Sequence, residues 1–92
     1  MSTSIEPTET WHVYLLQCAD QSLYTGIAKN LKARVEQHER GLAAKYTRSR
    51  RPVRLVYCEP ADDRSAAQRR EMEIKRMSAA AKRRLVANQV EA

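Results

Sequence analysis

The sequence has no long apolar run and no leader of the secretory type. No stretch of its 92 residues approaches the roughly 18 consecutive apolar residues that a membrane-spanning helix needs. Residues 1 to 10 are polar and slightly acidic, without the basic start and apolar segment of a signal peptide. We therefore expect a soluble, cytoplasmic protein with no membrane partner, and a disordered leader at residues 1 to 10.

Cysteine, glycine and large aromatic residues are also scarce. Cys18 and Cys58 have no CxxC pairing and no His-x-x-x-His spacing beside them, which argues against a zinc site and favours buried, reduced thiols. The chain has one Trp, no Phe and two Gly. A chain of this length forms one small domain with an adequate but not generous core. We expect that domain at residues 11 to 88, with a tail at residues 89 to 92.

Acidic residues are few, and one interval has none. The net charge of +6 and the pI of about 9.7 suit a polyanionic partner such as nucleic acid. From residue 40 to residue 58 every charged side chain is basic, and Tyr46, Thr47 and Ser49 add stacking and hydrogen-bonding groups that are useful on a phosphate backbone. Although a charge run is usually a solvated surface, this one predicts a nucleic-acid contact. Its residues are Lys45, Tyr46, Thr47, Arg48, Arg50 and Arg51.

Two β-rich runs, at residues 11 to 18 and 22 to 28, flank a short polar break and predict an antiparallel hairpin. Its first strand has consecutive apolar positions, which indicates that both faces are covered and that the strand is central. Tyr14 and Tyr24 lie at corresponding depths in the two arms, and Gly26 shares a strand face with Tyr24. A glycine inside a strand marks a bulge or the close approach of a backbone or ligand. The residues alone favour a core hairpin with a bulge at Gly26.

The remaining elements follow from helix-capping residues and from the positions of glycine and proline. Asn30 can cap a helix at residues 31 to 40, which Gly41 can close. A loop at 42 to 52, a strand at 53 to 57 and helices at 64 to 77 and 79 to 88 complete the chain. The order β-β-α-β-α-α predicts an α+β fold, a small three-stranded, mainly antiparallel sheet flanked by helices.

The helix at residues 31 to 40 carries two unusual inward groups. Leu31, Val35 and Leu42 form an apolar stripe, and Arg34 and His38 fall on the same side of the helix, one turn apart. An inward-facing arginine needs a partner or a ligand, because an unpaired buried charge is costly. A structural salt bridge and a cleft over this face are both compatible with the pattern.

The helix at residues 64 to 77 offers two carboxylates at the margins of its apolar stripe. Glu71 lies at one margin and Glu73 at the other. The spacing alone does not choose between them. The stripe itself consists of Ala66, Ala67, Ile74 and Met77.

Together these motifs resemble the GIY-YIG nuclease domain, in particular its small stand-alone bacterial group (UPF0213-like). The first triplet is represented by His12-Val13-Tyr14 and the second by Tyr24-Thr25-Gly26. The Arg of the family is Arg34, followed by His38, and the Lys45-Tyr46-Thr47 loop and Glu71 match in order and spacing. The resemblance covers roughly residues 11 to 85. The first triplet lacks its Gly and Ile, Gln21 stands in the hairpin turn where relatives often carry Gly, and Asn88 is the one candidate for a polar residue beyond the Glu helix.

The resemblance implies a structure- or damage-directed DNA endonuclease that uses one divalent ion, Mg²⁺ or Mn²⁺. In that family pattern Glu71 is the metal ligand, and Arg34 binds the scissile phosphate. Tyr24, with Tyr14 beside it, orients or deprotonates the attacking water, and His38 or Tyr46 assists in proton transfer or positioning. RNA is not excluded as a substrate, and a partner protein is expected to supply specificity. The alternative is a non-catalytic nucleic-acid-binding module on the same fold.

Overall fold

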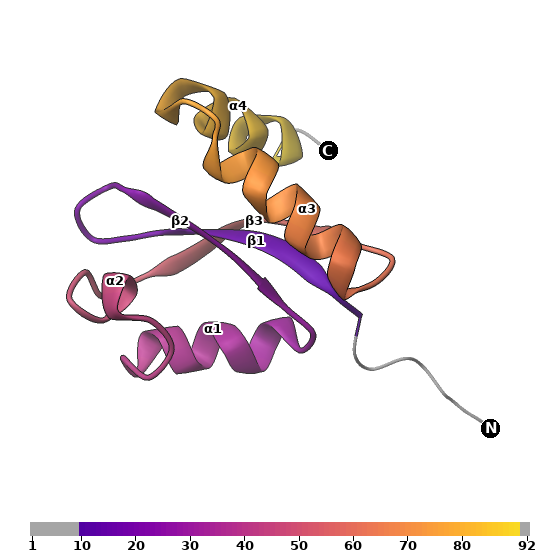
Figure 1. Ribbon diagram of the computed structural model, residues 1–92. Coiled ribbons are helices and arrows are strands. Elements are labelled where there is room, and N and C mark those ends of the chain that lie inside the picture. The colour runs from indigo at the N-terminus through magenta and orange to yellow at the C-terminus, as the bar shows by residue number, and fades with distance from the viewer. Residues whose placement is uncertain (1–9, 91–92) are drawn as a thin grey trace.

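Three antiparallel strands form the sheet, in the spatial order β2-β1-β3 (Figure 1). The computed structural model describes residues 10 to 90, so the expected leader, except Thr10, and the last two residues of the expected tail lie outside it. The α+β class is confirmed. The elements are β1 (His12–Gln17), β2 (Leu23–Ala28), α1 (Leu31–Glu39), α2 (Lys45–Arg48), β3 (Arg54–Pro60), α3 (Arg64–Lys75) and α4 (Ala79–Val90).

The element order differs from the expected one by a short helix. The segment from 42 to 52 was predicted as a loop, but α2 forms one helical turn within it. A turn of four residues is too short for a hydrophobic period to reveal. Arg48 N–H donates to the Ala44 carbonyl within the turn, and the Arg51 side chain donates to the Arg48 carbonyl at its end.

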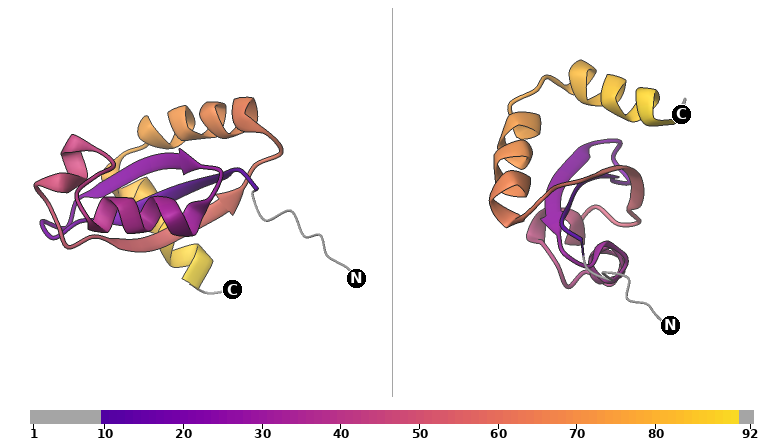
Figure 2. Two further views of the ribbon diagram at one scale, coloured as in Figure 1. Left: turned by 90° about the horizontal axis from the view of Figure 1, so that it is seen from below. Right: turned by 90° about the vertical axis from the view of Figure 1, so that its right-hand side faces the viewer.

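Helices cover both faces of the sheet, and the strand order confirms that β1 is central. Figures 1 and 2 show α1 and α2 on one side and α3 and α4 on the other. Val13 and Leu15 of β1 face Ala67 and Ile74 of α3 in one core cluster. The alternate residues of β1 belong to the second cluster, which has Leu31 and Val35 of α1 at its margin. In the described part of the chain, no helix has both the length and the apolar composition of a membrane span.

The stripe expected on α1 is shorter than predicted. Leu31 and Val35 pack against the core, but Leu42 is 71 % exposed because α1 ends at Glu39. Gly41 has a φ of +78°, as expected for the residue that closes a helix. The Arg51 guanidinium lies over this glycine and donates to the Glu39 carbonyl, so it ties the end of α1 to the chain after α2.

Gly26 is required by a close contact, and the expected bulge at this position is wrong. It pairs directly with Tyr14 across the hairpin, whereas Tyr24 pairs with Leu16. The two tyrosines therefore share a face but lie diagonally, instead of at corresponding depths. A Cβ on Gly26 would lie 2.5 Å from the Tyr14 hydroxyl oxygen. The one shift of register is in the β1–β3 pairing, between Leu15 and Leu16.

We predict that Gly26→Ala destabilises the fold by about 2 kcal/mol and lowers the melting temperature by about 10 °C. The added methyl group meets the ring of Tyr14, which is only 1 % exposed. Thermal denaturation followed by circular dichroism measures the change. In a Tyr14→Leu background the same substitution should cost much less, and an equal cost in both backgrounds would contradict this account.

The hairpin turn also has the geometry that the sequence suggested. Gln21 has a φ of +74°, the left-handed region that favours glycine. Asp20 stabilises the turn, since its carboxylate accepts from the backbone N–H and the hydroxyl of Ser22. Both cysteines are free, Cys18 buried and Cys58 half-buried.

Candidate active site

A chain of hydrogen bonds runs from β1 through α1 to α2. The Tyr14 hydroxyl lies 2.8 Å from His38 Nε2, and His38 Nδ1 lies 2.8 Å from Thr47 Oγ1. The Thr47 hydroxyl donates to the Ala44 carbonyl, so it accepts from His38 Nδ1–H. His38 Nε2 is then the acceptor for the Tyr14 hydroxyl proton. This assignment makes His38 a neutral imidazole that is placed to take a proton from Tyr14.

Burial keeps both ends of the Tyr14–His38 bond uncharged. Desolvation raises the pKa of Tyr14 to about 12, with the neighbouring Tyr24 and the Glu71 carboxylate adding to the rise and Arg34 opposing it. Desolvation, followed by the positive charge of Arg34, lowers the pKa of His38. Tyr24, Arg34 and Glu71 therefore lie near enough to Tyr14 to influence its ionisation. Tyr14 thus contacts one residue matched by the family pattern, His38, and lies within electrostatic range of three others.

The pKa of His38 predicts a pH dependence of stability. Because it is lowered in the folded state, the unfolded chain takes up a proton first, near the ordinary pKa of about 6.5. The contribution of His38 to stability is therefore fully present above about pH 6.5 and declines as the pH falls below it. Urea unfolding at pH 7.5, 6.5 and 5.5 should show this decline. It should vanish in His38→Gln and persist in His12→Gln, and a decline in both variants would contradict the assignment.

Tyr24 and Tyr46 form an aromatic wall beside His38. The Tyr24 ring meets the His38 ring edge-on, with 5.2 Å between centroids, and stacks on Tyr46 at 5.8 Å. The Arg50 guanidinium lies over the Tyr46 ring, 3.9 Å from the ring centroid. Tyr24 is half-buried and Tyr46 is 37 % exposed, so both are held in position while remaining partly accessible.

Arg34 is half-buried and makes no ion pair within residues 10 to 90. Its guanidinium donates to the Gln37 side-chain carbonyl at 3.0 Å. Of the two explanations left open by the sequence, the structural salt bridge is therefore not formed in this part of the chain. Arg34 instead lines an open groove at the edge of the site. Gln37, which sequence reasoning missed, orients it from one helical turn further on.

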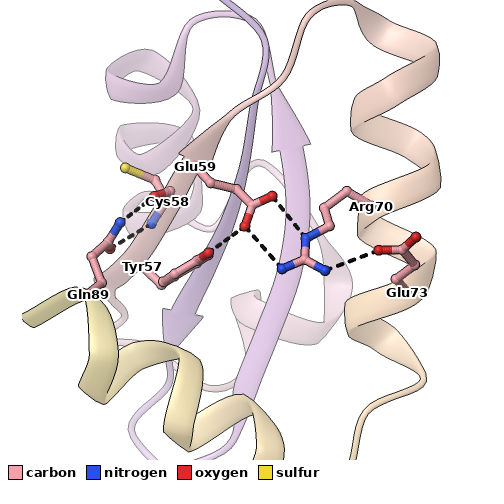
Figure 3. Close-up of polar contacts among 6 residues, drawn as sticks. All are labelled: Tyr57, Cys58, Glu59, Arg70, Glu73 and Gln89. Carbon is pink, nitrogen blue, oxygen red and sulfur yellow. Dashed lines mark hydrogen bonds and ion pairs between the residues drawn. The ribbon is translucent and has the colours of Figure 1, made fainter.

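The two carboxylates of α3 differ in their surroundings. The Glu71 side chain is 20 % exposed and lies 3.2 Å from the Lys75 ammonium. The Glu73 side chain is 63 % exposed and pairs with Arg70 on the outer side of the helix. Figure 3 shows that Arg70 also binds Glu59 of β3, which accepts from the Tyr57 hydroxyl. Glu73 is thus part of a cluster that ties α3 to the sheet, whereas Glu71 lies outside that cluster and influences the pKa of Tyr14.

A second contact in Figure 3 covers the free edge of β3. The Gln89 side-chain amide accepts from the Cys58 backbone N–H and donates to the Cys58 carbonyl. It thus provides the two hydrogen bonds that a neighbouring strand would provide. Gln89 lies in α4, which continues to Val90, beyond the end expected at residue 88.

The basic segment is only partly free for a ligand. Thr47 was expected to contact nucleic acid, but it is fully buried. Its hydroxyl binds His38 and the Ala44 carbonyl, so this assignment is wrong. Arg50 pairs with Asp20 and covers Tyr46, and Arg51 binds backbone carbonyls. Lys45 and Arg48 are exposed, and their side chains make no ion pair with the described residues. These two and Tyr46 are the members that are open to a phosphate backbone.

The donor set at this site suits a hard divalent cation. Within residues 10 to 90 no three His, Cys, Asp or Glu side chains gather in a metal-binding cluster. Mg²⁺ commonly takes one or two carboxylates and keeps several waters, so it does not need such a cluster. Glu71, which is partly exposed and lies within electrostatic range of Tyr14, fits that requirement.

Comparisons with known proteins identify the family. The model of the GIY-YIG catalytic domain matches residues 10 to 84, and the chain belongs to the GIY-YIG family. It thus carries a nuclease-type domain, and a domain of this type is suited to bind nucleic acid. A UPF0213 protein of Natronomonas pharaonis is 54% identical over 78 residues, covering 85% of this chain and 92% of that protein. A UPF0213 protein of Staphylococcus aureus strain Mu3 is 54% identical over 74 residues, covering 80% and 90%.

A solved structure supports the same conclusion. The solution NMR structure of a UPF0213 protein from Bacillus halodurans is 40% identical, with a TM-score of 0.55. The match covers 85% of this chain and 83% of that one. The resemblance recognised from the hairpin triplets, the arginine and the glutamate is therefore confirmed at the level of family and fold.

Proposed function

We propose that this protein is a divalent-metal-dependent endonuclease that hydrolyses phosphodiester bonds in DNA. The observation that carries the proposal is the hydrogen bond of the Tyr14 hydroxyl to His38, within electrostatic range of Tyr24, Arg34 and Glu71. A protein that only bound nucleic acid would gain nothing from a carboxylate facing its phosphates.

Each side chain of the site has a role that its chemistry suits. Glu71 would hold one Mg²⁺ or Mn²⁺ ion, which when bound lowers the pKa of a water and neutralises charge on phosphoryl oxygens. Arg34 matches two phosphate oxygens through its planar guanidinium. Tyr24, fixed between His38 and Tyr46, orients the attacking water. Lys45 and Arg48 bind flanking phosphates.

Tyr14 and His38 form a proton relay whose energetics need a cation. Moving the proton from Tyr14 to His38 is uphill, because burial raises the pKa of Tyr14 to about 12 and lowers the pKa of His38. A positive charge near the phenol oxygen lowers the pKa of Tyr14 and so reduces the cost of this transfer. We assign Tyr14 the role of taking a proton from the attacking water as its own hydroxyl proton passes to His38 Nε2.

A cleavage assay tests the proposal. Supercoiled plasmid and a four-way DNA junction are incubated with the purified protein in Mg²⁺, Mn²⁺ or EDTA. We expect nicked or resolved products with either metal and none in EDTA. Equal cleavage in EDTA would contradict metal dependence.

The second candidate is a non-catalytic nucleic-acid-binding module. The observation that favours it is the Lys75 ammonium, which already neutralises Glu71 and competes with a metal ion for it. This candidate predicts retarded migration of both DNA substrates in a gel without any cleavage in Mn²⁺. The same two substrates therefore separate the candidates.

A further inference from the structure

An open groove of about 400 Å³ adjoins the site at the first turn of α1. It lies where the start of β1, the end of β2 and the start of α3 meet. Three cations line it, Lys29, Arg34 and Arg64, together with the apolar side chains of Trp11 and Ile27. None of its lining residues is acidic. The groove therefore offers a ligand both positive charge and apolar surface.

Trp11 gives the groove a flat aromatic wall. Its side chain is half-buried, which holds it in place, and the Arg64 guanidinium lies 6.0 Å from its ring centroid. Indole rings and guanidinium planes are the groups on which unpaired nucleobases stack. Inorganic phosphate or an acidic peptide would match the cations but would leave the tryptophan unused.

Arg34 connects this groove to the candidate active site. It influences the pKa of Tyr14 and of His38 and also lines the groove. On α3, Arg64 at the groove precedes Glu71 by about two turns, or about 10 Å along the helix axis. This separation equals about three base steps of 3.4 Å in a duplex. If the scissile phosphate of a strand lies at Arg34 and Glu71, a nucleotide a few positions along that strand therefore reaches the groove.

We propose that the groove is a subsite for an unpaired nucleotide within about three nucleotides of the scissile phosphate. The base stacks on Trp11, and Arg64 and Lys29 bind its phosphate. Since a base must leave the duplex stack to lie on an indole, this subsite selects substrates with single-stranded or unpaired nucleotides near the cleaved bond. The inference rests on the proposed function and adds a substrate class to it.

The fluorescence of Trp11 tests the subsite directly, because it is the one tryptophan in the chain. The full-length protein is titrated with a short single-stranded oligothymidylate at low salt in EDTA, so that no cleavage occurs. Binding is followed in parallel by the anisotropy of a fluorescein-labelled copy. We expect the tryptophan emission to be quenched as the oligonucleotide binds. An abasic oligomer of the same length and charge should bind about tenfold more weakly and quench little.

A matched pair of variants on α3 provides the control. Arg64→Gln removes one charge at the groove and should weaken binding about fivefold to tenfold. Arg69→Gln removes the same charge from an exposed residue that contacts Ser65 outside the groove and should behave like the wild type. Anisotropy without quenching, equal quenching by the abasic oligomer, no binding, or equal weakening by both variants would each overturn the subsite.

The subsite and the nuclease fail in different experiments. If DNA is cleaved in Mn²⁺ but Trp11 emission is unaffected by the oligonucleotide, the subsite is wrong and the proposed function stands. If Trp11 is quenched but no DNA is cleaved, the groove binds unpaired nucleotides and the nuclease proposal is wrong.

Discussion

Glu71→Gln is expected to abolish metal-dependent cleavage while leaving the fold intact. The amide keeps the shape of the side chain and loses the charge that a hard divalent cation requires. Affinity for Mn²⁺ should fall at least tenfold, and cleavage of supercoiled plasmid should fall below detection. DNA binding in EDTA should hold or improve, because a negative charge facing the phosphates has gone. Isothermal titration with Mn²⁺, the plasmid assay and a gel-shift assay measure the three quantities.

Glu73→Gln is the matched control on the same helix. Its side chain is 63 % exposed and pairs with Arg70, which keeps its second partner, Glu59, in the variant. An exposed pair of this kind contributes about 0.5 kcal/mol, so stability and cleavage should both stay near wild type. Loss of cleavage in Glu73→Gln together with retained nicking in Glu71→Gln would overturn the assignment of the metal ligand.

Arg34→Ala is expected to reduce turnover about a hundredfold, which corresponds to about 3 kcal/mol of lost transition-state stabilisation. Arg34 has no ion pair in the described part of the chain, so its removal leaves no buried carboxylate behind. The melting temperature should therefore stay within a few degrees of wild type. Single-turnover cleavage and thermal denaturation give the two readouts.

Two further variants sharpen the test of Arg34. Arg34→Lys keeps the charge but loses the two-pronged geometry, and should recover only part of the lost rate. Lys32→Ala removes an exposed cation from the same helix and should leave turnover nearly unchanged. A large fall in melting temperature on removal of Arg34 would mark it as a structural residue, and its catalytic role would then fail.

The features of the fold that a local pattern encodes could be predicted from the sequence. The run from Val13 to Leu16 indicates a strand covered on both faces, and helices indeed lie on both sides of β1. Asn30 caps α1 through its side chain, and Gly41 closes it with a positive φ, as their residue types suggest. Such signals lie within a few residues of the element that they define.

The features that depend on tertiary contacts could not be predicted in this way. Thr47 looks like one more polar residue of a basic loop, and its role beside His38 follows from the packing of α2 on α1. Likewise Gly26 is explained by the ring of Tyr14, which reaches it across the hairpin. In the same way, the choice between Glu71 and Glu73 came from the family resemblance, since spacing on a helix does not say which margin faces a site.

The most direct test of the central claim is the position of one divalent ion on the protein. Mn²⁺ added in small amounts to isotope-labelled protein broadens the NMR signals of the nuclei nearest to it. We expect the broadening to be strongest around Glu71, to extend to Tyr24 and Arg34, and to disappear in Glu71→Gln. Broadening centred on another acidic segment, such as Asp62 and Asp63, or unchanged in Glu71→Gln, would contradict it.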